Sequence, residues 1–267
     1  MTKKNPPLGR QVEGPTGYAP EVLFPVPRDE GRAQLNRESP LPPHGTDIWH
    51  AYELSWLLPG GRPVIHTGRF LIPADSPNLV ESKSLKLYLN SLNNTEFADQ
   101  NEAVATITAD VSAVAGASIQ FELFGPDDAV LAGTNLPGDC LDEEALPHAD
   151  EPEGLVATGE VVEEQLYTHL VRSLCPVTGQ PDWATVWLKY RGPKIARGPL
   201  LAYFLSFRGH QEFHEQCVER MYGEIMGACG PESLEIQALY TRRGGLDISP
   251  WRSSHPGEAP TYRLNRQ

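Results

Sequence analysis

The stretch Glu96-Phe97-Ala98-Asp99-Gln100 is matched 116 residues later by Glu212-Phe213-His214-Glu215-Gln216, which keeps its glutamate, phenylalanine and glutamine. With one residue added to that offset, Ile119-Gln120 falls on Ile236-Gln237. Short matches arise by chance, but matches in the same order and at the same place among the predicted helices and strands favour an internal duplication.

The two copies share one order of predicted elements. Runs of β-branched and aromatic residues between turn residues predict strands, and longer periodic runs predict helices. The first copy is interpreted as strands over 47–57 and 64–72, helices near 83–93 and 98–115, and a strand over 118–124. The second is interpreted as strands near 166–174 and 183–191, helices near 199–208 and 211–229, and a strand over 234–240. Two copies of ββααβ(β) predict an α+β fold, with an antiparallel sheet in each half and the helices on one face.

The repeat divides the chain into three predicted segments. Residues 1–45 are rich in proline, glycine and charge, and we expect an extended N-terminal arm on the surface. Residues 46–150 and 151–267 are the two predicted modules, and the acidic stretch 142–154 is the predicted linker.

Composition limits the classes of function. Hydrophobic residues make up 40% and charged residues 21% of the 267 residues, which is typical of a globular protein with a core. A net charge of −13 argues against broad contact with nucleic acid, which needs a basic face. We expect no secretory signal and no membrane span, because no sufficiently apolar run is present. The cysteines form no CxxC pair, which predicts free thiols in a reducing cytosol and no structural metal: Cys140, Cys175, Cys217 and Cys229.

Cys175 lies in a proline-bracketed loop, seven residues before Asp182 and at the entrance of a predicted strand. A thiol can attack an electrophile and a nearby carboxyl group can move protons, so the pair predicts covalent catalysis. A buried thiol beside a turn aspartate is the structural alternative.

Three further clusters carry polar groups suited to an anionic or planar ligand. Glu81-Ser82-Lys83 stands at a predicted helix start, where backbone N–H groups attract anions, although a Ser-capped helix with solvated lysines is the simpler interpretation. His214-Glu215 could accept the N–H edge of a purine, or could belong to a surface helix in which Glu219 is solvated. Arg242-Arg243-Gly244-Gly245 could approach a phosphate, or could simply be solvated at a strand end.

The two halves differ where chemistry is expected. At the offset of 116 residues, Glu81 falls on Arg197 and Lys83 falls on Pro199, while the counterpart of Cys175 is a Leu-Pro-Gly turn without a thiol. Each half therefore holds groups that the other lacks, which favours one site built by both halves, or by two subunits, over two independent sites.

Together these clusters resemble the QueF family, the NADPH-dependent 7-cyano-7-deazaguanine reductases, in its long two-module form. The resemblance runs from 44–49 through 81–88 and 213–217 to 242–247. The run ESKSLKLY at 81–88 is similar to the signature of that family.

The resemblance implies a tunnelling fold (T-fold) of two tandem ββααββ modules. It also implies that a nitrile is reduced to an aminomethyl group with two NADPH and no metal, in queuosine biosynthesis. Cys175 would form a covalent thioimide and Asp182 would donate a proton. The implied substrate contacts are Val80, Glu81, Ser82, Phe213, His214 and Glu215, and the implied NADPH contacts are Ser82, Lys83, Arg243 and Gly244.

The residues alone are also compatible with two other functions. One is a zinc-dependent T-fold enzyme that acts on a pterin or on GTP, and the other is a purine-binding module without catalysis. We expect a cytoplasmic protein that acts on a small deazapurine, without direct contact with nucleic acid or membrane. A homodimer is expected, because tunnelling-fold barrels need several modules to close.

Overall fold

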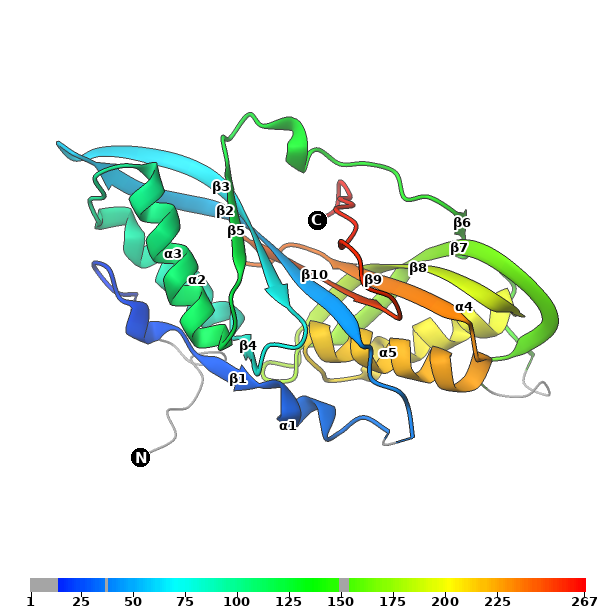
Figure 1. Ribbon diagram of the computed structural model, residues 1–267. Coiled ribbons are helices and arrows are strands. Elements are labelled where there is room, and N and C mark those ends of the chain that lie inside the picture. The colour runs from blue at the N-terminus through cyan, green and yellow to red at the C-terminus, as the bar shows by residue number, and fades with distance from the viewer. Residues whose placement is uncertain (1–13, 37, 149–153) are drawn as a thin grey trace. The chain divides into compact units, whose positions relative to one another are not determined.

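The computed structural model describes residues 14–36, 38–148 and 154–267. Its chain forms two compact units, each assembled from segments that are distant in the sequence (Figure 1). The first contains the residues up to Glu30 together with Asp47–Leu131 and Arg242–Asp247. The second contains Gly31–Thr46, Ala132–Thr241 and Ile248–Gln267.

Strands β2 (His44–Leu58), β3 (Arg62–Pro73) and β5 (Gln120–Phe124) form the sheet of the first unit, in the order β5-β3-β2. β3 and β5 are antiparallel, and across them Phe70 and Phe121 stack with ring centroids 4.4 Å apart. Helices α2 (Ser82–Ser91) and α3 (Gln100–Ala115) follow the strands β3 and β4 (Asn78–Val80) along the chain. Short 3-10 helices, labelled η, follow α2 and β5: η2 (Leu92–Asn94) and η3 (Ala129–Leu131).

The sequence of α3 explains both its ends and its buried face. The Asp99 side chain accepts a hydrogen bond from the Glu102 N–H at 2.9 Å, which caps the first turn. Its buried residues recur at helical spacing and contact β4 and β5: Ala103, Ile107, Val111 and Ala115. The helix ends at Gly116, whose φ of 72° favours glycine.

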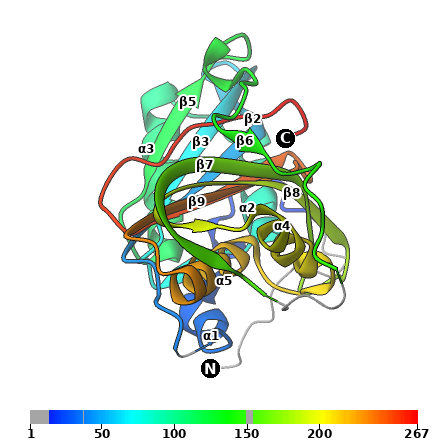
Figure 2. The ribbon, with the colours of Figure 1, turned by 90° about the vertical axis from the view of Figure 1, so that its right-hand side faces the viewer.

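The sheet of the second unit has the order β10-β9-β8-β7-β6. Its strands are β6 (Asp139–Cys140), β7 (Ala157–Leu174), β8 (Pro181–Ile195), β9 (Ser233–Tyr240) and β10 (Leu246–Ser253). Neighbouring strands from β7 to β10 are antiparallel, whereas β6 runs parallel to β7. The helices are α4 (Arg197–Ser206), followed by η4 (Phe207–Gly209), and α5 (His214–Cys229). Figure 2 shows both helices on the same face of β7, β8 and β9, where they bury Phe204 and Met221 against the strands.

The predicted α+β class with predominantly antiparallel strands is confirmed, and most predicted elements are found within a few residues of their expected bounds. β7 begins nine residues before the predicted strand start at 166, and the sequence did not predict β6 or β10. Part of the predicted arm has regular structure: η1 (Pro20–Val22), β1 (Pro25–Pro27) and α1 (Arg28–Arg32). β1 pairs with β4, and the buried Arg28 donates to Asp47 at 2.6 Å, which ties this segment into the first unit.

Among the described residues, no helix has both the length and the apolar character needed to cross a membrane.

Candidate active site

Cys175 occupies the loop between β7 and β8 and is 6% exposed. Its backbone N–H donates to the Gln180 carbonyl at 2.8 Å, and its own carbonyl accepts from the Gly179 N–H at 2.9 Å. Gly179 has a φ of 66°, a conformation that favours glycine. These contacts close the loop on itself and fix the backbone of the predicted nucleophile.

Asp182 is the second residue of β8, and its buried carboxylate Oδ2 lies 3.3 Å from Nε2 of His214. His214 is the first residue of α5, and its ring stacks on the Tyr240 ring with centroids 3.7 Å apart. Nδ1 of His214 is buried and has no hydrogen-bond partner among the described residues. The imidazole is therefore held by the carboxylate and by the tyrosine ring, while one of its nitrogens remains able to bond a ligand.

Main-chain contacts bring the Cys175 loop and the start of α5 to the same end of the second unit. Leu174, the residue before Cys175, donates its N–H to the His210 carbonyl at 2.8 Å. Across the hairpin, Ser173 pairs with Asp182. The structure thus brings together the predicted acid and His214 beside the loop that carries the predicted nucleophile.

The first turn of α5 also positions Phe213 and Glu215. Phe213 is the N-cap residue, and its carbonyl accepts the Cys217 N–H at 3.0 Å. Glu215 is 4% exposed, and the positive end of the helix dipole favours a carboxylate at this position. A buried carboxylate is suited to pair with adjacent N–H donors of a planar ring.

Glu219 is not solvated, so that part of the surface-helix interpretation was wrong. It is 4% exposed, and its carboxylate accepts hydrogen bonds from Arg32 and from the fully buried Arg252, the shortest at 2.8 Å and 3.0 Å. Two arginines from other elements compensate the charge of this carboxylate, which is why a glutamate can lie inside the unit.

The other cysteines are less suited to nucleophilic attack. Burial raises the pKa of Cys217 to about 12 and that of Cys229 to about 11. Burial is also the main cause of the raised pKa of Cys140. Since the thiolate is the nucleophilic form, the thiols of Cys217 and Cys229 remain protonated and unreactive near neutral pH.

In the first unit, Glu81 is the N-cap of α2, a position that the sequence had assigned to a serine. Its carboxylate accepts hydrogen bonds from the Lys83 N–H at 2.7 Å and the Ser84 N–H at 2.9 Å. Burial raises the pKa of Glu81. The carboxylate thus occupies two backbone donors at the helix start, so an anion bound here would rely on the side chains of Ser82 and Lys83. Val80, at the end of β4, is buried directly before this cap.

Arg243 and Gly244 belong to a tight turn that leads into β10. The Arg243 N–H donates to the Leu246 carbonyl at 2.9 Å, and the two residues between them are glycines with φ of 59° and 80°. Positive φ at both central positions is typical of a type I′ turn. A Cβ at Gly245 would lie 2.5 Å from Cδ of Glu53, so the Glu53 side chain would have to move to admit a larger residue there.

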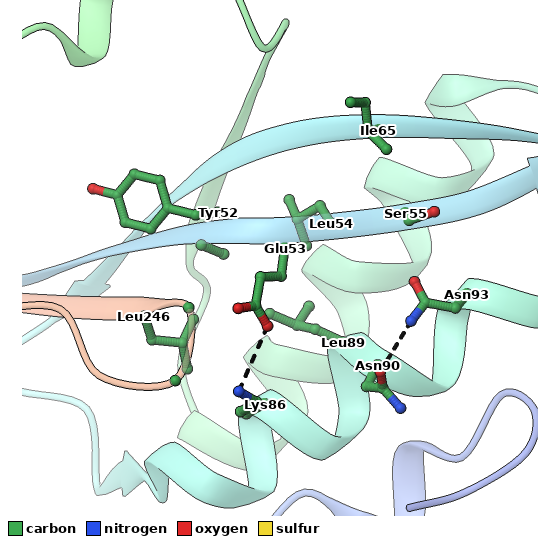
Figure 3. Close-up of a pocket in the computed structure, with 13 residues that line it drawn as sticks. Tyr52, Glu53, Leu54, Ser55, Ile65, Lys86, Leu89, Asn90, Asn93 and Leu246 are labelled. Atoms are coloured by element: carbon green, nitrogen blue, oxygen red, sulfur yellow. Dashed lines mark hydrogen bonds and ion pairs between the residues drawn. The ribbon is translucent and has the colours of Figure 1, made fainter.

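This turn borders a cavity of about 300 Å³ in the first unit (Figure 3). Figure 3 shows Lys86 on α2 pointing toward Glu53 on β2, with their charged atoms 3.5 Å apart. Asn90 and Asn93 add amide groups to the wall, and Leu89 and Ile65 add apolar surface. The mixture of a cation, amides, apolar groups and glycine backbone is typical of a small-molecule site.

The sequence interpretation missed a polar group beside this cavity. Nδ1 of His50 lies 2.7 Å from Asp247, and the Tyr52 hydroxyl donates to the same carboxylate at 2.5 Å. The Arg242 guanidinium lies over the Tyr52 ring, 3.4 Å from its centroid. Asp247 is nearly 200 residues from His50 and Tyr52 in the sequence, so no local pattern indicated this group.

Comparisons with known proteins agree on one family. A model described as "Nitrile reductase, 7-cyano-7-deazaguanine-reductase N-term" matches residues 15–123, and one described as "QueF-like protein" matches residues 181–259. The NADPH-dependent 7-cyano-7-deazaguanine reductase of Chromohalobacter salexigens is 48% identical, over 100% of this chain and 98% of the relative. The enzyme of the same name from Stenotrophomonas maltophilia is 50% identical, over 100% and 99%. The chain belongs to the NADPH-dependent 7-cyano-7-deazaguanine reductase family.

The matched regions cover most of the candidate residues. The Glu81 cluster lies within the first region, and Asp182, His214 and Arg243 lie within the second, whereas Cys175 falls between the two. A crystal structure of the archaeosine synthase QueF-Like in the apo form is 16% identical, with a TM-score of 0.31 over 40% of this chain and 100% of that one.

Proposed function

We propose that this chain reduces the nitrile of 7-cyano-7-deazaguanine to the aminomethyl group with NADPH, in queuosine biosynthesis. Membership of the reductase family, with curated relatives close to 50% identical over the full chain, supports this activity. The observation that carries the mechanism is the fixed, buried Cys175 in the loop beside Asp182 and His214.

In the first step, the Cys175 sulfur adds to the nitrile carbon. Direct hydride addition would place negative charge on an unassisted nitrogen, whereas thiolate addition with protonation of that nitrogen gives a neutral thioimide. The C–S bond forms as one π bond of the nitrile breaks, and the nitrogen takes up one proton. Hydride from NADPH would then add to the thioimide carbon, and the C–S bond would break to return the Cys175 thiolate and leave an imine. A second hydride and a second proton would reduce that imine, so that one nitrile, two NADPH and two protons give one amine and two NADP⁺.

Asp182 provides the proton in this mechanism, and His214 supports it. The buried carboxyl group of Asp182 lies 3.3 Å from Nε2 of His214, so the proton has a second position on the imidazole. Nδ1 of His214, which has no partner among the described residues, can hydrogen-bond the ligand.

The substrate contacts are assigned to residues at the start of α5 and to residues around the cap of α2. Glu215 accepts the N–H edge of the deazaguanine, and Phe213 covers the ring from the residue before α5. The residues around the α2 cap contribute the other substrate contacts: Val80, Glu81 and Ser82. Loss of a hydrogen bond from a charged, buried acceptor costs about 1.5–3 kcal/mol, so Glu215→Gln should weaken deazaguanine binding far more than NADPH binding.

The NADPH contacts are assigned to Ser82, Lys83, Arg243 and Gly244. Gly244 lines the cavity of the first unit, and a Cβ there would lie 3.1 Å from Nζ of Lys86, so the Lys86 ammonium group and the glycine backbone meet at one place. This combination fits the phosphates of NADPH, because the backbone can approach closely while the cations pair with the anion.

The proposal extends to the assembly. Each unit repeats the order strand, strand, helix, helix, strand, which supports a T-fold of two tandem modules within residues 46–150 and 151–267. We assign the protein to the cytoplasm as a homodimer without direct contact with nucleic acid, in keeping with its net charge of −13.

The test is NADPH oxidation, followed by absorbance after addition of 7-cyano-7-deazaguanine. The expected result is two NADPH consumed per nitrile, with no activity in Cys175→Ala and near-normal activity in the matched control Cys229→Ala. NADPH oxidation that does not depend on the nitrile, or full activity in Cys175→Ala, would contradict the proposal.

A further inference from the structure

A second cluster of chemically capable side chains lies at the β6 edge of the second unit, apart from the residues assigned to the reaction. Cys140, Asp142 and His169 each offer one ligand atom, and these three atoms lie within 4.8 Å of one another. Within the described parts of the chain, this is the one group of three His, Cys, Asp or Glu residues with such spacing.

The backbone of β6 is held closely against β7. Cys140 pairs with Tyr167 in parallel register, and the Leu141 N–H donates to the Tyr167 carbonyl at 2.8 Å. A Cβ at Gly138, whose φ is 98°, would lie 2.1 Å from the Gln165 carbonyl oxygen. Only glycine permits this approach, so the position of Cys140 beside His169 is fixed by the chain.

Hydrogen bonds also orient the other two side chains. Oδ1 of Asp142 accepts from the Thr168 hydroxyl at 2.7 Å and from the His169 N–H at 3.0 Å. Nδ1 of His169 lies 2.9 Å from the Thr185 hydroxyl. Outer hydrogen bonds that fix a carboxylate and one nitrogen of an imidazole are characteristic of metal ligands, and a ring nitrogen of His169 lies within 4.8 Å of the ligand atoms of Cys140 and Asp142.

We propose that Cys140, Asp142 and His169 bind a zinc ion, with a water as the fourth ligand. Thiolate and imidazole favour Zn²⁺ over Mg²⁺ or Ca²⁺, which prefer oxygen ligands. Zinc–ligand bonds of about 2.0–2.3 Å place tetrahedral ligand atoms about 3.5 Å apart. Cys140 is exposed, which provides the route for the ion. The ion would link β6 to β7, because Cys140 lies on β6 and His169 on β7. Cys175 is not one of its ligands.

The experiment titrates ZnCl₂ into the full-length, chelator-treated protein against a chromophoric chelator, and repeats the titration with Co²⁺ to record thiolate-to-metal absorption. The variants are Cys140→Ser, Asp142→Asn and His169→Gln, and Cys175→Ala is the matched thiol control. Circular dichroism of each metal-free variant establishes that it is folded.

The expected result is one equivalent of Zn²⁺ bound by the wild type and by Cys175→Ala. Loss of one protein ligand should weaken binding by about 100-fold or more, since changes to outer-shell partners alone cost 10–100-fold. The Co²⁺ thiolate absorption should vanish in Cys140→Ser only. Added Zn²⁺ should raise the melting temperature of the wild type but not of Cys140→Ser.

Equal zinc affinity in wild type and Cys140→Ser would overturn the proposal, as would thiolate absorption that disappears in Cys175→Ala instead. These outcomes are independent of nitrile reduction, which is measured separately by NADPH oxidation, so failure of one proposal is not failure of the other.

Discussion

Gly245→Ala is a sharp test of the turn that borders the cavity of the first unit. Gly245 has a φ of 80°, and placing alanine in such a conformation costs about 1–2 kcal/mol. The new Cβ would also lie 2.5 Å from Cδ and 2.8 Å from Cγ of Glu53, so that side chain must move away from Lys86. Loss of this exposed ion pair and local adjustment add about 1 kcal/mol. The expected total is about 2–3 kcal/mol.

Gly244→Ala is the matched control, because its φ is 59° but its nearest contact is the flexible end of Lys86, at 3.1 Å. It should cost only the backbone contribution, about 1–2 kcal/mol. Urea unfolding measures both variants, alone and with Glu53→Ala, which should reduce the cost of Gly245→Ala to that of Gly244→Ala. The reasoning is refuted if the two glycine variants lose the same free energy of unfolding, or if Glu53→Ala does not reduce the loss caused by Gly245→Ala.

Further predictions concern stability. Burial raises the pKa of Cys217 to about 12 from 9.0, so the protonated thiol is favoured in the folded state. The free energy of unfolding that results is fully present below about pH 9 and is lost as pH rises toward 12. The slope is about 1.4 kcal/mol per pH unit, and Cys217→Ala should remove it in urea unfolding measured against pH; an unchanged slope would contradict burial as the cause. Glu219→Ala leaves the fully buried Arg252 without this acceptor and should cost about 3–5 kcal/mol by urea unfolding, whereas a loss under 1 kcal/mol would show that the pair is dispensable. Glu81→Ala removes the cap of α2 and should cost about 1–2 kcal/mol in thermal unfolding, and an unchanged melting temperature would count against capping.

Local patterns were sufficient for much of the fold. Strand-forming runs between turn residues marked β2, β3, β8 and β9, because these strands are bounded by clear turns. β10 was missed because its proline and its polar residues interrupt the apolar pattern, although all eight of its residues are buried. β6 has two residues and depends on its parallel pairing with β7, which no local pattern encodes.

In the candidate site, too, some residues were indicated by local sequence patterns and others were not. Cys175 and Asp182 could be found together because a single hairpin holds them, and His214 and Glu215 because the internal repeat drew attention to the start of α5. The capping role of Glu81 was missed, since serine follows it and is the commoner cap.

Groups assembled from distant segments were not predictable. His50 meets Asp247 across nearly 200 residues of sequence, and Cys140 meets His169 only because β6 pairs with β7. A single histidine in a strand, such as His169 in β7, gives no indication of its neighbours.

The most direct measurement is the intact mass of the protein after incubation with 7-cyano-7-deazaguanine in the absence of NADPH, followed by peptide mapping. The account predicts a mass increase of one nitrile molecule on the peptide that carries Cys175, reversed on addition of NADPH and absent in Cys175→Ala. Turnover without any adduct on this sulfur, or an adduct mapped to another cysteine, would contradict it.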